Sequence, residues 1–175
     1  MTRKSPNHRH IFAILFFQVV ALGVVPGLLR ANEEGSDRNY QKLEQKLKAT
    51  TDPIGKVKTL IEMADIQLRG AVHKAMENHF TEADQYLSRY QDVIRQTQEI
   101  LKGSGRNAQK KAGGFMHFEL ALKRQLRTLE DLRSVYPYEL SQKLTKSVEE
   151  AKTAQENMLM QIFGEGNVGN LKNEK

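Results

Sequence analysis

Apolar residues recur every three or four positions through most of this chain, and this spacing restricts the fold more than any other feature. Between Pro53 and about His79 they are Val57, Leu60, Ile61, Ala64, Leu68, Ala71, Val72 and Ala75. A helix of 3.6 residues per turn places such residues on one face, where they can be buried together. Strands favour aromatic and β-branched residues, whereas only 7% of this chain is aromatic. The spacing therefore predicts an all-α fold.

The first two long helices have recognisable start and stop signals. Asp52-Pro53 is a helix start, because the Asp side chain accepts from free backbone amides and Pro suits the first helical position. Thr81 and Asp84 resemble a capping box at the start of the second helix, with Asp in place of the usual Glu or Gln. We expect Gly103 to end that helix in a left-handed conformation.

Two further helices follow. Asn107 is a candidate cap for the third, whose apolar residues begin at Phe115. Tyr136-Pro137 closes that helix and opens the next, which Gly164 ends. We expect residues 53–164 to form an antiparallel bundle of these four long helices, with a bent array of helical hairpins as the alternative.

The segments on either side of the expected bundle are more polar. Residues 32–52 predict a linker that begins with Asn32–Asp37 and contains one short helix, on which apolar residues stand at Tyr40, Leu43 and Leu47. Residues 165–175 are rich in Gly and Asn and predict a disordered tail.

Residues 1–31 have the pattern of a secretory signal peptide. A basic stretch over residues 1–10 precedes an apolar stretch over 11–25, and the helix breaker Pro26-Gly27 is followed by the small residue Ala31. We expect cleavage after Ala31. Leu29, at position −3 from this cleavage site, is larger than the small residue usually found there.

An uncleaved membrane anchor is the alternative. Residues 11–29 carry no charge and approach the length that spans a bilayer. The basic N-terminus would then remain cytoplasmic and the rest would face outward. In both cases we expect an extracytoplasmic protein, periplasmic or secreted, whose N-terminal segment engages the membrane during export.

The formal net charge of +6 comes mostly from this leader. Residues 1–31 contain four basic residues and no acidic one, which leaves 23 basic and 21 acidic residues in the rest of the chain. Nucleic-acid binding usually needs a clustered basic face, so we expect no nucleic-acid partner. The chain contains no Cys, which excludes disulfides, thiolate metal ligands and a Cys nucleophile.

His73, Met76 and His79 form the sharpest candidate for a metal or haem site. Steps of three residues bring side chains to one broad face of a helix. Imidazole and thioether groups suit copper or haem iron. Further candidate ligands on later helices are Met116, His117, Met158 and Met160. The alternative is that the methionines fill the core and the histidines are solvated.

A second candidate site is a basic surface for an anion or a partner. It consists of Lys102, Arg106, Lys110 and Lys111, joined by Lys123, Arg124 and Arg127 on the following helix. The segment 103–107 could also bind an anion through free backbone amides. The alternative is a solvated surface, because acidic residues are interspersed.

Four tyrosines form the third candidate, namely Tyr86, Tyr90, Tyr136 and Tyr138. They indicate either the edge of the core, with hydroxyls reaching water, or a groove for a partner peptide.

Catalytic motifs are missing from the sequence. It contains no His-Glu-x-x-His helix, no Gly-x-Ser-x-Gly elbow and no Walker loop. No Glu is followed by His three residues later, which excludes the di-iron pattern of helical bundles. We therefore expect no enzymatic activity and no resident cofactor.

Residues 78–83, followed by Leu87 and Tyr90, resemble the middle of a tetratricopeptide repeat, but no second copy lies about 34 residues further on. The leader and helix pattern together resemble the exported helical domains of unknown function that are common in bacteria. This resemblance implies neither an activity nor site residues.

We expect a non-enzymatic helical module of the cell envelope with an interaction or structural role. Its partner would be an envelope protein or an anionic surface. The alternative function is an extracytoplasmic metal- or haem-binding bundle that uses His73, Met76 and His79.

Overall fold

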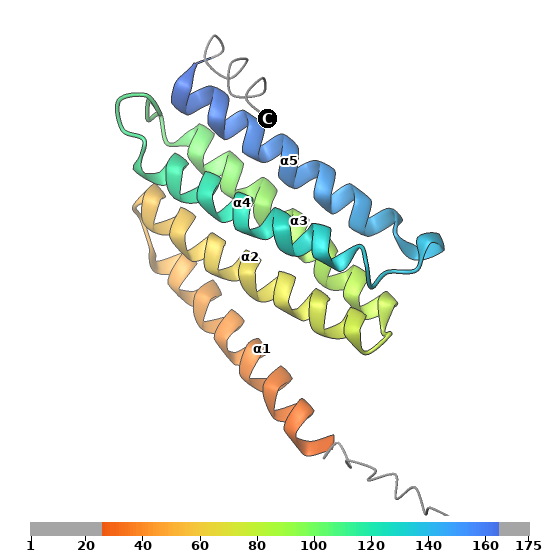
Figure 1. The fold of residues 1–175 in the computed structure, drawn as a ribbon. Helices are drawn as coiled ribbons and strands as arrows, with labels where there is room; N and C mark the ends of the chain where they lie inside the picture. The colour runs from red at the N-terminus through yellow and green to blue at the C-terminus, as the bar shows by residue number, and fades with distance from the viewer. Residues whose placement is uncertain (1–25, 165–175) are drawn as a thin grey trace, which may run out of the picture.

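The computed structural model describes the backbone of residues 26–164 and the side chains of residues 37–164 (Figure 1). Within this range the chain is all-α, with five α-helices, one short 3-10 helix and no strand. The all-α prediction is therefore confirmed. The apolar stretch over residues 11–25 and the predicted tail over 165–175 lie outside the described residues. Among the described helices, none has both the length and the apolar character needed to cross a bilayer.

Helix α1 spans Pro26–Ala49 and is longer than the short helix expected within residues 32–52. Its backbone continues through the polar stretch that the sequence assigned to a linker, and Pro26 stands at its first position, where no backbone N–H is needed. Three half-buried side chains at helical spacing, Tyr40, Leu43 and Leu47, pack it against the core. Helix α1 makes its main contact with α2.

Helix α2 spans Pro53–Met76 and begins as the sequence predicts. Asp52 Oδ2 accepts a 2.7 Å hydrogen bond from the Gly55 backbone N–H, and Pro53 follows the cap directly. The helix ends in a tight turn in which Asn78 has a φ of 62°. Asn tolerates this left-handed conformation better than most residues. Helix α3 then starts at once and spans Phe80–Gly103.

The predicted cap at the start of α3 was wrong, and the helix ends at Gly103 as predicted but without the predicted left-handed conformation there. The helix begins at Phe80, so Thr81 is inside it and caps nothing, and no side chain caps this end. The left-handed Asn78 brings the chain into the helix two residues earlier than a Thr81 cap would allow. At the other end Ser104 keeps helical angles and donates its hydroxyl to the Leu101 carbonyl, so the left-handed residue is Gly105, with a φ of 64°, rather than Gly103.

Helix α4 spans Gly113–Leu132 and α5 spans Gln142–Phe163. Asn107 does not cap α4, because its side chain accepts hydrogen bonds from the backbone amides of Gln109 and Lys110 in a separate turn. Helix α4 ends before the predicted Tyr136-Pro137 boundary, and the short helix η1, Tyr138–Leu140, leads into α5. Gly164 ends α5 with a φ of 81°, as predicted.

Helices α2 to α5 pack as two antiparallel pairs, α2 with α3 and α4 with α5 (Figure 1). Helix α2 also packs on α4, and α3 packs on α5, whereas α3 and α4 touch at few points. The consecutive helices α3 and α4 are therefore diagonal to each other. The connecting residues 104–112 can reach about 30 Å when extended, which is ample for a diagonal of roughly 14 Å between packed helices.

The core lies between these four helices. It is mostly Leu, Ala, Val and Phe, and its largest fully buried side chains are Tyr90, Phe115, Phe118, Leu60 and Leu87. Six polar side chains are also buried, namely Thr59, Gln67, Gln91, Thr97, Gln125 and Ser147. Buried polar groups are costly unless they form hydrogen bonds. Thr59 and Thr97 donate to the backbone carbonyls of Gly55 and Val93, one turn earlier, at 3.1 and 2.8 Å.

Candidate functional site

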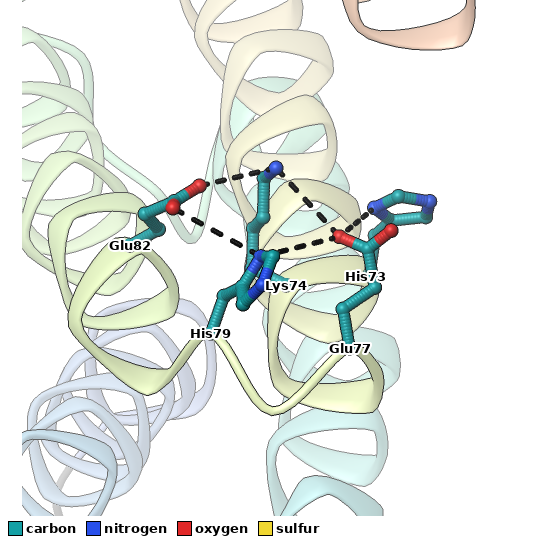
Figure 2. A network of polar contacts seen from close by, with 5 residues as sticks. All are labelled: His73, Lys74, Glu77, His79 and Glu82. Atoms are coloured by element: carbon teal, nitrogen blue, oxygen red, sulfur yellow. Dashed lines mark ion pairs between the residues drawn. The ribbon is translucent and has the colours of Figure 1, made fainter. Parts of the chain in front are cut away.

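The α2–α3 turn carries a network of charged side chains, and two of the predicted metal ligands belong to it (Figure 2). Glu77 Oε2 lies 3.4 Å from His73 Nδ1, 3.7 Å from His79 Nδ1 and 3.7 Å from Lys74 Nζ. Glu82 approaches from α3, with Oε2 3.1 Å from Lys74 Nζ and Oε1 3.9 Å from His79 Nδ1. The network joins the last turn of α2 to the first turn of α3.

The charges in this network suit the ends of the two helices. Lys74 stands near the C-terminus of α2 and Glu82 near the N-terminus of α3, where a cation and an anion respectively interact favourably with the helix dipoles. Lys74 is only 12% exposed, so its ammonium group lies between the two carboxylates largely out of water. The arrangement accounts for a tight and stable turn.

Met76, the third predicted metal ligand, takes no part in this network and is 70% exposed. Met116 and His117 lie at the start of α4, at the opposite end of the helices from His73, and Met158 is buried in the core. In the described part of the chain no three His, Asp or Glu side chains are grouped as a metal site. Metal or haem binding by His73, Met76 and His79 stays a prediction.

The predicted basic loop lies at the other end of the helices. Lys102, Arg106, Lys110 and Lys111 are all exposed. Arg106 Nη2 lies 3.4 Å from Asp52 Oδ1, which ties the loop to the residue that caps α2. Within residues 37–164 the three lysines have no ion-pair partner. The loop is thus anchored by the Arg106–Asp52 pair and by Ala108, which is buried in the core, and this surface presents three lysines without an ion-pair partner among the described residues.

The backbone of this loop does not offer the free amides that were expected over residues 103–107. The Arg106 N–H donates to Ser104 Oγ at 3.3 Å, and the Gln109 and Lys110 amides donate to Asn107 Oδ1. The segment also does not lead straight into a helix, because α4 begins only at Gly113. The side chains, rather than the backbone, carry the positive charge that an anion would meet.

The four predicted tyrosines do not line one groove. Tyr90 is fully buried, and Tyr136 is buried against Phe80 with ring centroids 5.2 Å apart. Tyr86 packs over Gly70, and Tyr138 is 90% exposed. Tyr90 therefore lies in the core rather than at its edge, and the hydroxyls of Tyr90 and Tyr136 donate to the polar side chains Gln125 and Asp84.

Burial is the main cause of the pKa shifts of Tyr90, Tyr136 and Asp84. Burial, with Asp65 and Glu150 nearby, raises the pKa of Tyr90 far above its usual value. Burial also raises the pKa of Tyr136, whose hydroxyl donates to Asp84 Oδ1 at 3.2 Å. Partial burial raises the pKa of Asp84, and the bond from Tyr136 opposes that shift. Both tyrosines are therefore held as neutral hydrogen-bond donors.

An open groove of about 410 Å³ lies between α1, α2 and α3. Leu47, Met63 and Ile100 give it apolar walls, and Lys48 and Lys56 are also part of its lining. Tyr40 lines it as well, and burial followed by the charge of Glu44 raises the pKa of this tyrosine. No local pattern in the chain predicts this groove, because its walls come from three different helices.

A buried polar network, which the sequence did not predict, crosses the helices. Tyr90 donates to Gln125 Oε1 at 3.2 Å, and Gln125 Nε2 donates to Asp65 Oδ1 at 2.7 Å. Gln91 Nε2 similarly donates to Ser147 Oγ at 3.0 Å, from α3 to α5. The sequence does carry a sign of this network. Gln91 and Gln125 stand at positions of the helical spacing where apolar residues are expected, on the buried faces of their helices.

Comparison with protein-family models, with curated proteins and with solved structures gives no match for this chain.

Proposed function

We propose that this chain is an exported, non-enzymatic interaction module of the cell envelope, in which an antiparallel helical bundle follows a signal or anchor segment. The observation that carries the proposal is the loop between α3 and α4. Lys110 and Lys111 in this loop, and Lys102 in the last turn of α3 just before it, are exposed and have no ion-pair partner within residues 37–164. Uncompensated cations grouped on one surface attract an anionic partner.

Two features of the loop support this proposal. The loop is ordered by its own hydrogen bonds and by the contact between Arg106 and Asp52, so its cations are positioned before a partner arrives. A surface that is already ordered loses less conformational entropy on binding.

The core network engages Asp65 and Tyr90 in internal hydrogen bonds, which fits a structural role for these titratable groups.

Cell fractionation with matched variants tests the proposal. The full chain should be found outside the cytoplasm, bound to the envelope fraction and released by salt, and N-terminal sequencing should show whether cleavage follows Ala31. Changing Lys102, Arg106, Lys110 and Lys111 together to Gln should abolish envelope binding.

A control variant changes four exposed cations elsewhere, Lys42, Lys58, Arg69 and Lys146, to Gln and should bind as the wild type does. A cytoplasmic chain would overturn the proposal. Equal loss of binding in both quadruple variants would also overturn it, because it would indicate a general charge effect.

The metal-binding alternative is decided by a separate measurement. The purified protein is analysed for bound metal and for visible absorbance, alongside the His73→Ala/His79→Ala double variant. A stoichiometric metal or haem band that disappears in the double variant would overturn the interaction-only proposal. A folded protein without metal would overturn the alternative.

A further inference from the structure

We propose that the exposed face of α4 binds a membrane surface rich in anionic phospholipid. This inference rests on the proposed function, because it extends the basic loop along α4 and names the loop's partner. The surface, called the α4 face below, consists of Lys110, Lys111, Met116, Leu120, Lys123, Arg124 and Arg127, all of them exposed.

Helix geometry brings these residues together. At about 100° per residue, Met116, Leu120, Lys123, Arg124 and Arg127 fall within an arc of about 120° on α4. The opposite side of the helix carries Phe118, Leu122, Leu129 and other core residues, which pack toward α2 and α5. Lys110 and Lys111 directly precede the helix. The three cations of α4 and the two apolar side chains therefore form one stripe, and Lys110 and Lys111 lie in the loop just before its N-terminal end.

Glu119 and Glu130 lie beside this stripe, whereas Asp131 falls on its arc one turn beyond Arg127 and marks the end of the basic stretch. Glu119 lies on the side of α4 toward α5, half-buried, and accepts a hydrogen bond from Gln155 Nε2 at 3.0 Å. Glu130 pairs with Lys152 at 2.8 Å and with Arg133 at 3.2 Å. Asp131 is the exposed acid at the far end of the helix. The five cations of the α4 face have no ion-pair partner within residues 37–164.

Met116 and Leu120 distinguish a lipid surface from other anionic partners. Each is 47% exposed, and they stand one helical turn apart among the cations. Helices that lie on membranes combine basic residues, which attract anionic headgroups, with apolar side chains that enter the acyl boundary. Nucleic acid would give these two apolar side chains no comparable environment. The combination of charge and apolar exposure therefore favours a bilayer over a soluble polyanion.

A site-specific label provides the test. Because the chain has no Cys, Met116→Cys can carry a single environment-sensitive fluorophore in the full chain, with Val135→Cys, 39% exposed beyond the end of α4, as the matched control. Vesicles of mixed phosphatidylglycerol and phosphatidylcholine should shift the emission of the label at 116 to the blue and leave the label at 135 unchanged. This readout reports the α4 face itself, independently of any lipid contact of the predicted leader.

Variants that remove charges test how much each cation contributes to vesicle binding. Each Lys or Arg near an anionic membrane strengthens binding about fivefold. Lys123→Gln/Arg124→Gln/Arg127→Gln should therefore raise the lipid concentration at half-maximal shift about a hundredfold. Leu120→Gln should raise it by roughly tenfold with the charges intact. Lys58→Gln/Arg69→Gln/Lys146→Gln, which removes three exposed cations elsewhere, should leave it unchanged.

Three results would overturn the inference: no shift with anionic vesicles, an equal shift with phosphatidylcholine alone, or equal weakening by the two triple variants. Binding of a duplex oligonucleotide through the three α4 cations, without a vesicle response, would overturn it as well. If loop-dependent envelope binding persists in such a case, the proposed function stands and only the lipid partner is wrong. If vesicles bind but the chain stays cytoplasmic, the lipid-binding α4 face stands and the proposed envelope function is wrong.

Discussion

Gln125 on α4 donates a 2.7 Å hydrogen bond to Asp65 on α2 while it accepts one from the buried Tyr90 hydroxyl on α3. One side chain thus connects three helices, including α3 and α4, which are diagonal to each other. A buried polar connection of this kind is satisfied only when the helices are in register, so it favours one packing over others that would bury the same apolar area.

Gln125→Ala should lower the free energy of unfolding by about 2–4 kcal/mol, because it leaves a cavity and removes a partner from both Asp65 and Tyr90. Chemical denaturation followed by circular dichroism measures this. Gln85→Ala, at an exposed position of α3, should stay within about 0.5 kcal/mol of the wild type. If Tyr90→Phe costs the same with and without Gln125→Ala, the two residues are not coupled.

Gly70→Ala should be destabilising although Ala is the better helix former. A Cβ at this position would stand 2.5 Å from the Tyr86 ring, and such overpacking costs about 1–3 kcal/mol against a helix-propensity gain of about 1 kcal/mol. In a Tyr86→Ala background the same change should become stabilising. Gly103→Ala, with no atom within 4 Å of the new Cβ, is the control and should stabilise slightly. A stabilising Gly70→Ala in the wild-type background would contradict the packing.

Asp52→Ala should cost about 1 kcal/mol, because α2 loses the side chain that caps its first turn. Asp52→Asn keeps an acceptor for the Gly55 amide and loses only the charge opposite Arg106, so it should cost less than half as much. Thermal unfolding of the two variants checks this. Equal losses would assign the stabilisation to the ion pair instead of the cap.

Glu130→Gln should remove part of the pH dependence of stability. Lys152, and then Arg133, hold the pKa of this carboxyl below its usual 4.5. Because the folded-state pKa is lower than the unfolded one, the contribution is present above about pH 4.5 and is lost as the pH falls through the folded value. Solvent screening limits it to a few tenths of a kcal/mol up to about 1 kcal/mol.

Unfolding measured at pH 7 and at pH 3 therefore separates Glu130→Gln from the wild type mainly at pH 7. Glu139→Gln, at an exposed position without an ion pair within residues 37–164, serves as the control and should show no such difference. A larger effect of Glu130→Gln at pH 3 would contradict the assignment.

The ends of helices were predictable from the sequence where a few neighbouring residues decide where the helix begins or stops. Asp52-Pro53 starts α2 and Gly164 ends α5, since capping depends on residues three or four positions away. Asn107 failed as a cap because the same side chain can also close a turn, and that turn formed. The exposed loop position of Lys110 and Lys111 was also predictable from the sequence, because polar connecting segments lie at the surface.

The sequence by itself determined the helical class and the burial of Leu87, Leu122 and Val148. The spacing of apolar residues by three and four positions is visible within each short stretch of chain, without knowledge of the neighbouring helices. Only the tertiary structure decided that α3 and α4 are diagonal, that Gln125 reaches both Asp65 and Tyr90, and that His73 and His79 meet at Glu77 rather than at Met76. These contacts depend on the direction in which each helix leaves its turn. They join residues whose separation in the chain carries no information about their distance in space.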